Sequence, residues 1–592
     1  MEGKWSLKEI YLGFDDDKFK EDINKGKLII EEFKALADKS ETLDNKKLLE
    51  EYINLNLKCN DVIGKAYEFC NLTYAVNTKD INAQRYMDVL ENQLSSITEY
   101  DSRIKLQVGK VKNLSELVKE SELIKEHKFF IEEIINNEKY ILSPEVENVI
   151  AKMKNTGSIA WAKLRDGETS VVKVKLDNNR KEEEVPLTVA RNLAYDKSEE
   201  VRKSAYEAEL KAYKSIDESV AAALNGIKGE VITVTNLRGY DSPLQEALFS
   251  SRMSEKTLEA LISAIEDYYP VFRKYLKRKG EILGHKNGLP FYDLFAPIGE
   301  LTREIPFEEG KKIVLDNFYS FSKKLGDFAK NAMDNNWIDV YPREGKVGGA
   351  FCSTITSIKE SRVMLNYGGN FTDVVTMAHE LGHGYHGSVL KDESAINNEY
   401  PMPLAETAST FCETLLKTNM INTLPEDEAL TVLEGEISDA TQVIVDIMSR
   451  FKFEKEVFER RKEAALSVEE LCDIMIETQK STYGDGLDEN YLHPYMWICK
   501  PHYYDGDYNF YNYPYAFGQL FAKGLYKIYE DKGEAFVEEY DKLLKSTGKM
   551  NIVDVGKTIG IDFEDKSFWV NSLKVMEKDI EKFLKLTDNI IK

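Results

Sequence analysis

The stretch TDVVTMAHELGHGYHGSVL, residues 372–390, decides the fold and the chemistry of this 592-residue chain. It contains HELGH at residues 379–383, which matches the pattern HExxH. Residues four apart on a helix lie on the same face, so His379 and His383 can share one tetrahedral zinc ion. Glu380 points about a third of a turn away, which suits a carboxylate that holds a metal-bound water without ligating the metal. The pattern is that of zinc proteases, and it predicts one zinc ion as cofactor.

The residues around the two histidines are mostly apolar, so we expect this helix to be largely buried. These apolar residues are Val374, Val375, Met377, Ala378, Leu381 and Val389. Buried histidine and glutamate side chains need polar partners, and a metal ion would provide one for all three. The alternative is a helix with two ordinary surface or core histidines, and the apolar flanks disfavour it.

A catalytic zinc site usually has three protein ligands and one open position. The third histidine of the pattern HExxHxxGxxH is excluded, because His386 occupies its glycine position and Val389 its last histidine position. The other common third ligand is a glutamate from a following helix. The sequence MPLAETASTFCETLLKTNM, residues 402–420, predicts such a helix. Glu406 and Glu413 are about two turns apart in it and share a face.

We predict that Glu406 is the third ligand. The small residues around it, in AETAS, allow a second backbone to pack close to the metal helix. Glu413 is predicted to form a hydrogen bond with a ligand histidine. The alternative for Glu413 is an ordinary carboxylate on a helix surface.

The sequence HELGHGYH followed by PLAETAST resembles the zinc metallopeptidase family of thimet oligopeptidase and neurolysin, and most closely its bacterial branch, oligoendopeptidase F. The resemblance runs from about residue 110 to near residue 575, and includes DKSEEVRKSAYEA, LRGYDSPLQEAL and YDLFAP. It implies a mainly α fold, a large multi-helix neurolysin-like zincin with a deep substrate channel. It also implies small β elements near the active site and in the N-terminal lobe.

The resemblance, together with the helical spacing of apolar residues, implies two parts. Residues 1–190 are expected to form an N-terminal helical lobe, since apolar residues recur at helical spacing from about residue 15 to 150. Within this lobe, residues 155–187 alternate apolar and polar side chains and contain turn residues, which predicts a small strand hairpin. Residues 191–592 are expected to form the catalytic helical metallopeptidase domain.

Two strands are predicted just before the metal helix, in GKVGGAFCSTI (residues 345–355) and SRVMLNYGG (residues 361–369). Gly348 and its neighbour permit close approach of another backbone, and an exposed strand edge can bind a peptide by backbone pairing. The resemblance implies this use. The candidate substrate-binding residues are therefore Gly349, Ala350 and Phe351, and the alternative is a purely structural hairpin.

Residues 491–518 hold His493 and His502 and are dense in tyrosine. A buried tyrosine usually finds a partner for its hydroxyl group, so this density indicates a polar, partly wet cavity. The alternative is an aromatic core or a loop with aromatic anchors. The segment HYYDGDYNFYNYPYAFG also resembles a His-plus-Tyr loop of the family, which implies that His502, Tyr508 and Tyr515 contact the oxyanion and the substrate carbonyl. The register of this match leaves two further candidates, Tyr511 and Tyr513.

Composition limits the partners and the compartment. The net charge is −24, with 103 acidic and 79 basic residues, which disfavours nucleic acid and anionic membranes as partners. The six cysteines show no CxxC pattern and are expected to be reduced. The N-terminus lacks the features of a secretion signal, and the chain has no apolar run long enough to span a bilayer. We expect a cytoplasmic protein, and a monomer and a homo-oligomer both remain open.

The motifs predict a zinc peptidase, with Glu380 activating a zinc-bound water. The resemblance implies an endopeptidase that hydrolyses internal bonds of short oligopeptides. The nearest alternative is a zinc carboxypeptidase of similar helical fold, for which the motifs place no arginine that could bind a substrate C-terminus. A non-catalytic peptide-binding protein would be expected to lose the metal residues, which are present here. A structural zinc site would be closed by four ligands and rich in cysteine, and Cys412 is the one cysteine nearby.

Overall fold

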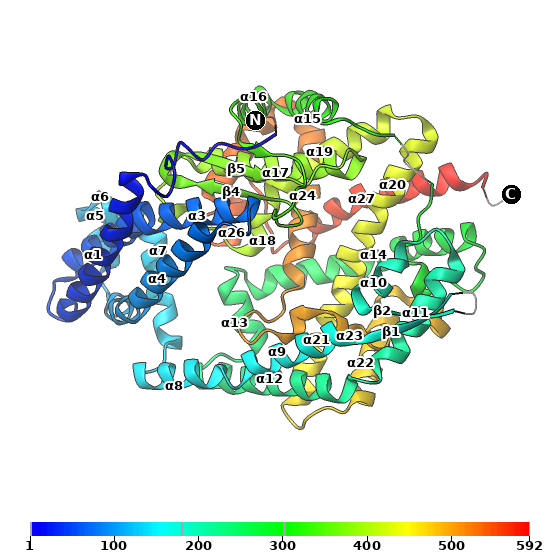
Figure 1. Ribbon diagram of the computed structural model, residues 1–592, viewed down its shortest axis with the longest axis horizontal. Helices are drawn as coiled ribbons and strands as arrows, with labels where there is room; N and C mark the ends of the chain where they lie inside the picture. The colour runs from blue at the N-terminus through cyan, green and yellow to red at the C-terminus, as the bar shows by residue number, and fades with distance from the viewer. Residues whose placement is uncertain (1–2, 179–180, 300–302, 591–592) are drawn as a thin grey trace. The chain divides into compact units, whose positions relative to one another are not determined.

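The computed structural model describes residues 3–178, 181–299 and 303–590, and it is mainly α-helical with short strands (Figure 1). This confirms the predicted fold class. Contacts within the chain divide it into two compact units. Unit 1 comprises residues Met1–Ile141, Arg303–Leu416 and Ile528–Ile561, and unit 2 comprises Leu142–Thr302, Lys417–Lys527 and Asp562–Lys592. Each unit is assembled from three separate segments, and the division of the sequence at residue 190 stays a prediction.

Unit 1 begins with a group of amphipathic helices. Helix α1 is preceded by Asp16, whose side chain accepts a hydrogen bond from the backbone of Lys18, as expected of an N-cap residue. Its buried apolar residues, such as Phe19 and Phe33, recur at helical spacing and belong to the core of this group. The helices are α1 (Asp17–Lys39), α2 (Asn45–Cys59), α3 (Lys65–Val76), α4 (Ile81–Gly109), α5 (Leu114–Glu120), α6 (Glu122–Glu126) and α7 (Lys128–Asn137).

The rest of unit 1 surrounds a small sheet with strand order β3-β5-β4. The strands are β3 (Ile338–Asp339), β4 (Phe351–Ile355) and β5 (Glu360–Met364). Strand β4 is antiparallel to β5, with Phe351 opposite Met364, and it lies at the edge of the sheet. The helices of this part are α15 (Phe307–Phe321), α16 (Lys323–Asp334), α17 (Phe371–Leu390), α18 (Met402–Ala405), α25 (Phe536–Ser546) and α26 (Ile552–Lys557).

Helix α17 packs against this sheet, beside β4 and β5 (Figure 1). The helix starts with a capping box, in which Asn370 and Asp373 each accept a hydrogen bond from the other's backbone. Gly387 lets β4 approach the helix closely, because a Cβ atom there would lie 2.2 Å from the Thr354 hydroxyl oxygen. Gly384 instead makes room for α16, because a Cβ atom there would lie 2.8 Å from the Phe328 ring.

Unit 2 is a helical body with one hairpin. Its elements are α8 (Pro144–Lys154), α9 (Ser158–Val171), β1 (Lys173–Asn178), β2 (Lys181–Pro186), α10 (Leu187–Asn192), α11 (Glu199–Tyr213), α12 (Asp217–Arg238), α13 (Pro243–Ser250), α14 (Glu255–Ile282), α20 (Glu426–Thr441), α21 (Ile447–Arg461), α22 (Val468–Tyr483), α23 (Met496–Cys499) and α27 (Lys566–Thr587). Helices α19 (Thr407–Thr423) and α24 (Tyr513–Lys532) each contribute residues to both units.

The predicted hairpin at residues 155–187 is only partly correct. Strands β1 and β2 pair antiparallel, with Lys173 opposite Pro186, but residues 158–171 form helix α9. Ser158 and Arg165 are the buried residues of α9. They are seven residues apart, which places them on one helical face two turns from each other. Ser158 donates a hydrogen bond to Glu230 of α12, and Arg165 donates to the Ile498 carbonyl of α23. Tertiary contacts therefore outweigh the local alternation of apolar and polar residues.

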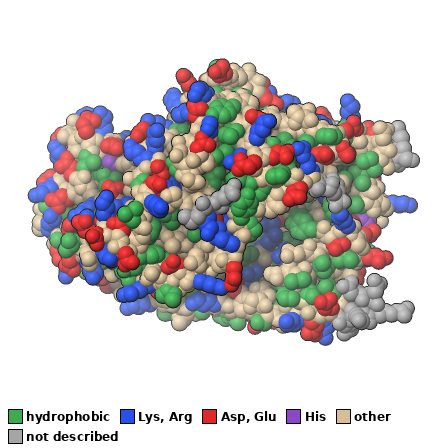
Figure 2. All heavy atoms as spheres, turned by 45° about the horizontal axis from the view of Figure 1, so that its top comes forward, with side chains coloured by type: hydrophobic (Ala, Val, Ile, Leu, Met, Phe, Trp, Pro, Cys, Tyr) green, Lys and Arg blue, Asp and Glu red, His purple; other side chains and the backbone are tan. Residues whose placement is uncertain are grey.

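The surface carries both signs of charge. Acidic and basic side chains are interspersed over the face shown in Figure 2, although acidic residues are in excess in the whole chain. None of the helices in residues 3–178, 181–299 and 303–590 combines the length and the hydrophobicity that crossing a lipid bilayer requires.

Candidate metal centre

Helix α17 and the chain after it bring three potential ligand atoms together in unit 1. The Nε2 atoms of His379 and His383 lie 3.2 Å apart. The Oε2 atom of Glu406 lies 3.3 Å from Nε2 of His379 and 3.4 Å from Nε2 of His383. The three atoms thus form a nearly equilateral triangle.

This triangle fits a tetrahedral zinc ion. With ligand bonds of about 2.0–2.1 Å, the edge of a regular tetrahedron is roughly 3.3–3.4 Å, which matches the three separations. Two imidazole nitrogens and one carboxylate oxygen are also a usual donor set of catalytic zinc. Among the described residues, Cys412 is not part of this group, so the arrangement lacks the fourth protein ligand of a closed structural site.

Glu406 lies at a break between two helices. Helix α18 ends at Ala405 and α19 begins at Thr407, so the single helix expected over residues 402–420 is wrong at this point. The Ser409 hydroxyl donates a hydrogen bond to Glu406 Oε2 at 2.8 Å. The break directs Glu406 toward the histidines, and Ser409 restrains the oxygen that faces them.

The close approach of α19 to α17 depends on Gly382, between the two histidines. A Cβ atom at Gly382 would lie 2.7 Å from the Ala408 carbonyl oxygen and 2.7 Å from the Ser409 Cα. Both contacts are shorter than real Cβ atoms show. Glycine at this position therefore lets the backbone that carries Glu406 lie directly against the helix that carries the histidines.

Glu413 lies beside the first histidine. His379 Nδ1 and Glu413 Oε1 are 2.5 Å apart, so the ring donates its Nδ1 hydrogen to the carboxylate and presents Nε2 to the other two ligand atoms. Burial opposes the charge on the ring, but the hydrogen bonds to Glu406 and Glu413 outweigh it and raise the pKa of His379 to about 10. Burial also opposes the charge on Glu406, but hydrogen bonds from the two histidines hold its pKa well below the usual range.

Glu380 is a buried carboxylate without a protein partner. It is 6% exposed, and among the described residues none donates a hydrogen bond to it. Burial raises the pKa of Glu380, although the neighbouring histidines counteract this effect. A buried acceptor of this kind normally needs a donor, and a water molecule beside the ligand triangle would supply one.

The predicted substrate-binding residues lie at the start of the edge strand in the same unit. Gly349 has a positive φ of 79°, and no atom lies within 4 Å of a Cβ built on it. Its carbonyl accepts a hydrogen bond from Asn366 at 2.8 Å. Ala350 follows, and Phe351 is the first residue of β4. The backbone that leads into the edge strand β4 therefore has open space beside Gly349 and is held in place by the hydrogen bond from Asn366.

The predicted His-plus-Tyr residues belong to unit 2 and gather there into an aromatic cluster. His502 stacks on Tyr511, with ring centroids 5.6 Å apart, and contacts Tyr515 edge-on at 6.3 Å. Tyr508 contacts Tyr511 at 6.5 Å and is 67% exposed. Tyr513 is buried, and its hydroxyl lies 3.0 Å from the Ser251 hydroxyl. This bond makes Tyr513 the least suitable candidate for contact with a substrate.

A second group of possible ligands, which was not predicted, differs from the first. It consists of Glu199, His285 and Asp293 in unit 2. Asp293 is already occupied, because it accepts a hydrogen bond from Arg202 at 2.7 Å and lies 2.6 Å from His285. This group is a satisfied ion-pair network, and the triangle in unit 1 is the better candidate for a metal centre.

Comparison with known proteins agrees with the site. Residues 192–575 match the family model "Peptidase family M3", and residues 111–171 match the model "Oligopeptidase F". The chain is 24% identical to oligopeptidase PepF of Bacillus subtilis over 595 aligned residues, covering 99% of the chain and 87% of the relative. It is 28% identical to the chromosomal oligoendopeptidase F of Lactococcus lactis over 70% of the chain and 69% of that protein.

A solved structure shows the same fold. The crystal structure of oligoendopeptidase-F from Enterococcus faecium superposes with a TM-score of 0.68 at 18% identity, covering 97% of the chain and all (100%) of that structure.

Proposed function

The chain belongs to peptidase family M3, and we propose that it is a zinc-dependent endopeptidase that hydrolyses internal bonds of short oligopeptides. The observation that carries this proposal is the ligand triangle of His379, His383 and Glu406 beside the buried, unpartnered Glu380. Zinc bound to the triangle would supply a Lewis acid that polarises a carbonyl group and lowers the pKa of water.

The proposed role of Glu380 is general base and then general acid. Its carboxylate accepts a proton from the attacking water and donates it to the nitrogen of the leaving amine. Burial suits this role, because it raises the pKa of the carboxyl and brings it closer to neutral pH, where a base and its conjugate acid are both accessible. Glu413 holds the His379 ring in the orientation that presents Nε2 to the metal.

The edge of β4 is proposed to bind the peptide. A substrate in extended conformation can add to this edge by backbone hydrogen bonds, with Gly349 and Ala350 at the point of entry. For His502, Tyr508 and Tyr515 we retain the prediction made from the resemblance, that they donate hydrogen bonds to the substrate carbonyl and the oxyanion. One such donor is typically worth about 3–4 kcal/mol. The restriction to short peptides and the cytoplasmic location likewise stay predictions.

The decisive experiment is digestion of a peptide ladder, from about five to thirty residues in length, together with one unfolded protein. Products are identified by mass spectrometry, with and without a chelator, and zinc is then added back. Internal cleavage of the shorter peptides that is lost with the chelator and restored by zinc would support the proposal. Stepwise loss of C-terminal residues would indicate the carboxypeptidase, and zinc binding without any cleavage would indicate a peptide-binding protein.

A matched pair of variants tests the base. Glu380→Gln should retain zinc and lose about 100- to 10,000-fold in kcat, the usual contribution of a general base. Glu304→Gln, an exposed glutamate of the same unit, should cleave like the parent protein. A Glu380→Gln variant with near-normal turnover would refute the assigned role.

A further inference from the structure

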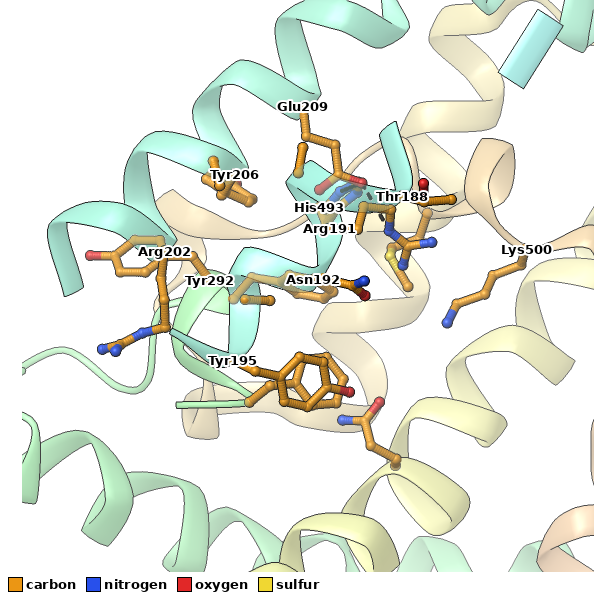
Figure 3. A pocket seen from close by; sticks show the side chains of 17 residues that line it. Thr188, Arg191, Asn192, Tyr195, Arg202, Tyr206, Glu209, Tyr292, His493 and Lys500 are labelled. Carbon is orange, nitrogen blue, oxygen red and sulfur yellow. Dashed lines mark ion pairs between the residues drawn. The ribbon is translucent and has the colours of Figure 1, made fainter. Parts of the chain in front are cut away.

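A cavity lies wholly within unit 2 and has a volume of about 320 Å³. It is lined by residues of α10 and α11, by the segment around Tyr292, by the segment from His493 to Lys500 that contains α23, and by Gln442 (Figure 3). Its size is at the lower end of the range of small-molecule sites. The sequence analysis did not predict this cavity, although Arg202, Tyr292 and His493 lie in segments that it singled out.

The charges around the cavity leave one cation in excess. Arg191 Nε lies 3.2 Å from Glu209 Oε1, so these two charges neutralise each other. Arg202 is paired with Asp293 at 2.7 Å, and in Figure 3 its guanidinium points away from the other labelled cations. Among the described residues, none forms an ion pair or hydrogen bond with the Lys500 ammonium group. Asp446 acts on it electrostatically but is itself paired with Arg450.

The polar ends of three side chains converge in this cavity. Figure 3 shows Arg191, Asn192 and Lys500 pointing toward a common space. The ion pair of Arg191 uses Nε, which leaves its two terminal nitrogens as donors. His493 also lines the cavity and is 2% exposed; its Nε2 lies 3.5 Å from Glu209 Oε1, and its Nδ1 has no hydrogen-bond partner. The terminal nitrogens of Arg191 and the Lys500 ammonium group remain as donors, and buried donors without partners are costly, so a bound acceptor would satisfy them.

The remaining wall is aromatic. The rings of Tyr195 and Phe295 lie 5.0 Å apart and tilted by 35°, and both line the cavity. Tyr195 is 62% exposed, so it marks the opening to solvent. Phe291 is buried on the inner side. An apolar or aromatic group could therefore enter beside Tyr195 while a charged group reaches Lys500.

We propose that this cavity binds a small monocarboxylate, with its carboxylate held by Lys500, Arg191 and Asn192 and its apolar or aromatic part against Tyr195 and Phe295. A single negative charge matches the single unpaired cation, whereas a phosphate dianion would leave one charge uncompensated. The planar carboxylate also matches the paired donors of a guanidinium. Two sources share this chemistry, a free aromatic acid and the C-terminal residue of a short peptide.

Binding is measured by ligand-observed NMR titration of the full chain as purified. The probes are phenylacetate for a free acid and N-acetylphenylalanine for a peptide terminus. Each is paired with its neutral amide, and phenyl phosphate is added as the dianion. We expect at least one carboxylate to bind about tenfold or more tightly than its amide, as the loss of one charge-assisted contact implies. The tighter of the two carboxylates identifies the source.

Variants locate the binding. Lys500→Met should weaken binding of the carboxylate probe by about tenfold or more. Lys274→Met, at an exposed position of α14 in the same unit, should leave this affinity unchanged. Asn192→Leu, at an exposed position, provides a second test that does not disturb buried residues, and circular dichroism checks the fold of each variant. Equal affinities for carboxylate and amide, tighter binding of phenyl phosphate, or full binding by both cavity variants would overturn the proposal.

Discussion

Replacing Gly382 with alanine tests whether close packing of two backbones builds the metal centre. The new Cβ atom would lie 2.7 Å from a carbonyl oxygen of α19, about 0.7 Å less than the 3.4 Å at which ordinary contact begins. Because the obstacle is backbone, α19 must move away by roughly that distance. Overpacking of this kind typically costs about 1–3 kcal/mol of stability.

The shift would displace Glu406, which lies just before the contacted residues Ala408 and Ser409. Metal sites tolerate errors of only about 0.2 Å in ligand distances. A displacement of about 0.7 Å should therefore weaken zinc binding by about 10- to 100-fold, as disruption of a ligand's supporting contacts does. It should also lower kcat/KM about 100-fold at saturating zinc.

The assay is competition for zinc with a chromophoric chelator, followed by peptide hydrolysis at increasing zinc concentration. The matched control is Gly435→Ala in α20, where a new Cβ atom meets nothing within 4 Å and the gain in helix propensity should stabilise by about 0.5–1 kcal/mol. If Gly382→Ala binds zinc and cleaves peptides like Gly435→Ala, close packing at residue 382 is not what positions Glu406.

Three further predictions concern individual contacts. Glu413→Ala should weaken zinc binding about 10- to 100-fold in the same chelator competition, because His379 loses its Nδ1 partner; unchanged affinity would refute this role. His386 is fully buried and its pKa is lowered to about 3, mainly by burial, so below pH 6.5 the unfolded chain binds a proton that the folded chain does not. From pH 7 to pH 5 this should remove about 2 kcal/mol of stability. Denaturant unfolding should show a smaller loss for His386→Gln, and an identical pH dependence would contradict the assignment. Tyr515→Phe should lower kcat. Tyr513→Phe should mainly cost about 1 kcal/mol of stability, because the Tyr513 hydroxyl is hydrogen-bonded to Ser251. If Tyr513→Phe lowered kcat and Tyr515→Phe lowered only stability, the two roles would be exchanged.

The candidate metal centre was predictable because its spacing is local. His379 and His383 are one helical turn apart, and their geometry follows from the helix itself. Glu406 could be chosen because small residues surround it, but the reason it reaches the histidines is a break in the helix at that residue. The break was not predicted, since the apolar spacing continues through it.

Features that depend on distant segments were less accessible. Residues 158–171 alternate like a strand and yet form a helix, because its buried residues Ser158 and Arg165 form hydrogen bonds with α12 and α23. The cavity of Arg191 and Lys500 joins residues more than three hundred positions apart in the sequence. Some of its lining residues, such as Arg202 and Tyr292, lie in segments that carry the family resemblance, but nothing in those segments indicates that they meet around a cavity. Local periodicity cannot report such contacts, since they are made by the tertiary structure.

The three histidines of α17 show how far spacing alone can go. His386 follows His379 by seven residues, so it lies on nearly the same face of the helix but about 10.5 Å further along. There its ring stacks on Tyr400 at 4.3 Å, and Nε2 lies 2.9 Å from the Thr547 hydroxyl. Protein groups thus bind and bury His386, whereas His379 and His383 direct their Nε2 atoms at each other and at Glu406. The same helical stripe therefore supplies one histidine that is held by protein groups and two whose arrangement fits a cation, and it is the partners of each ring that distinguish them.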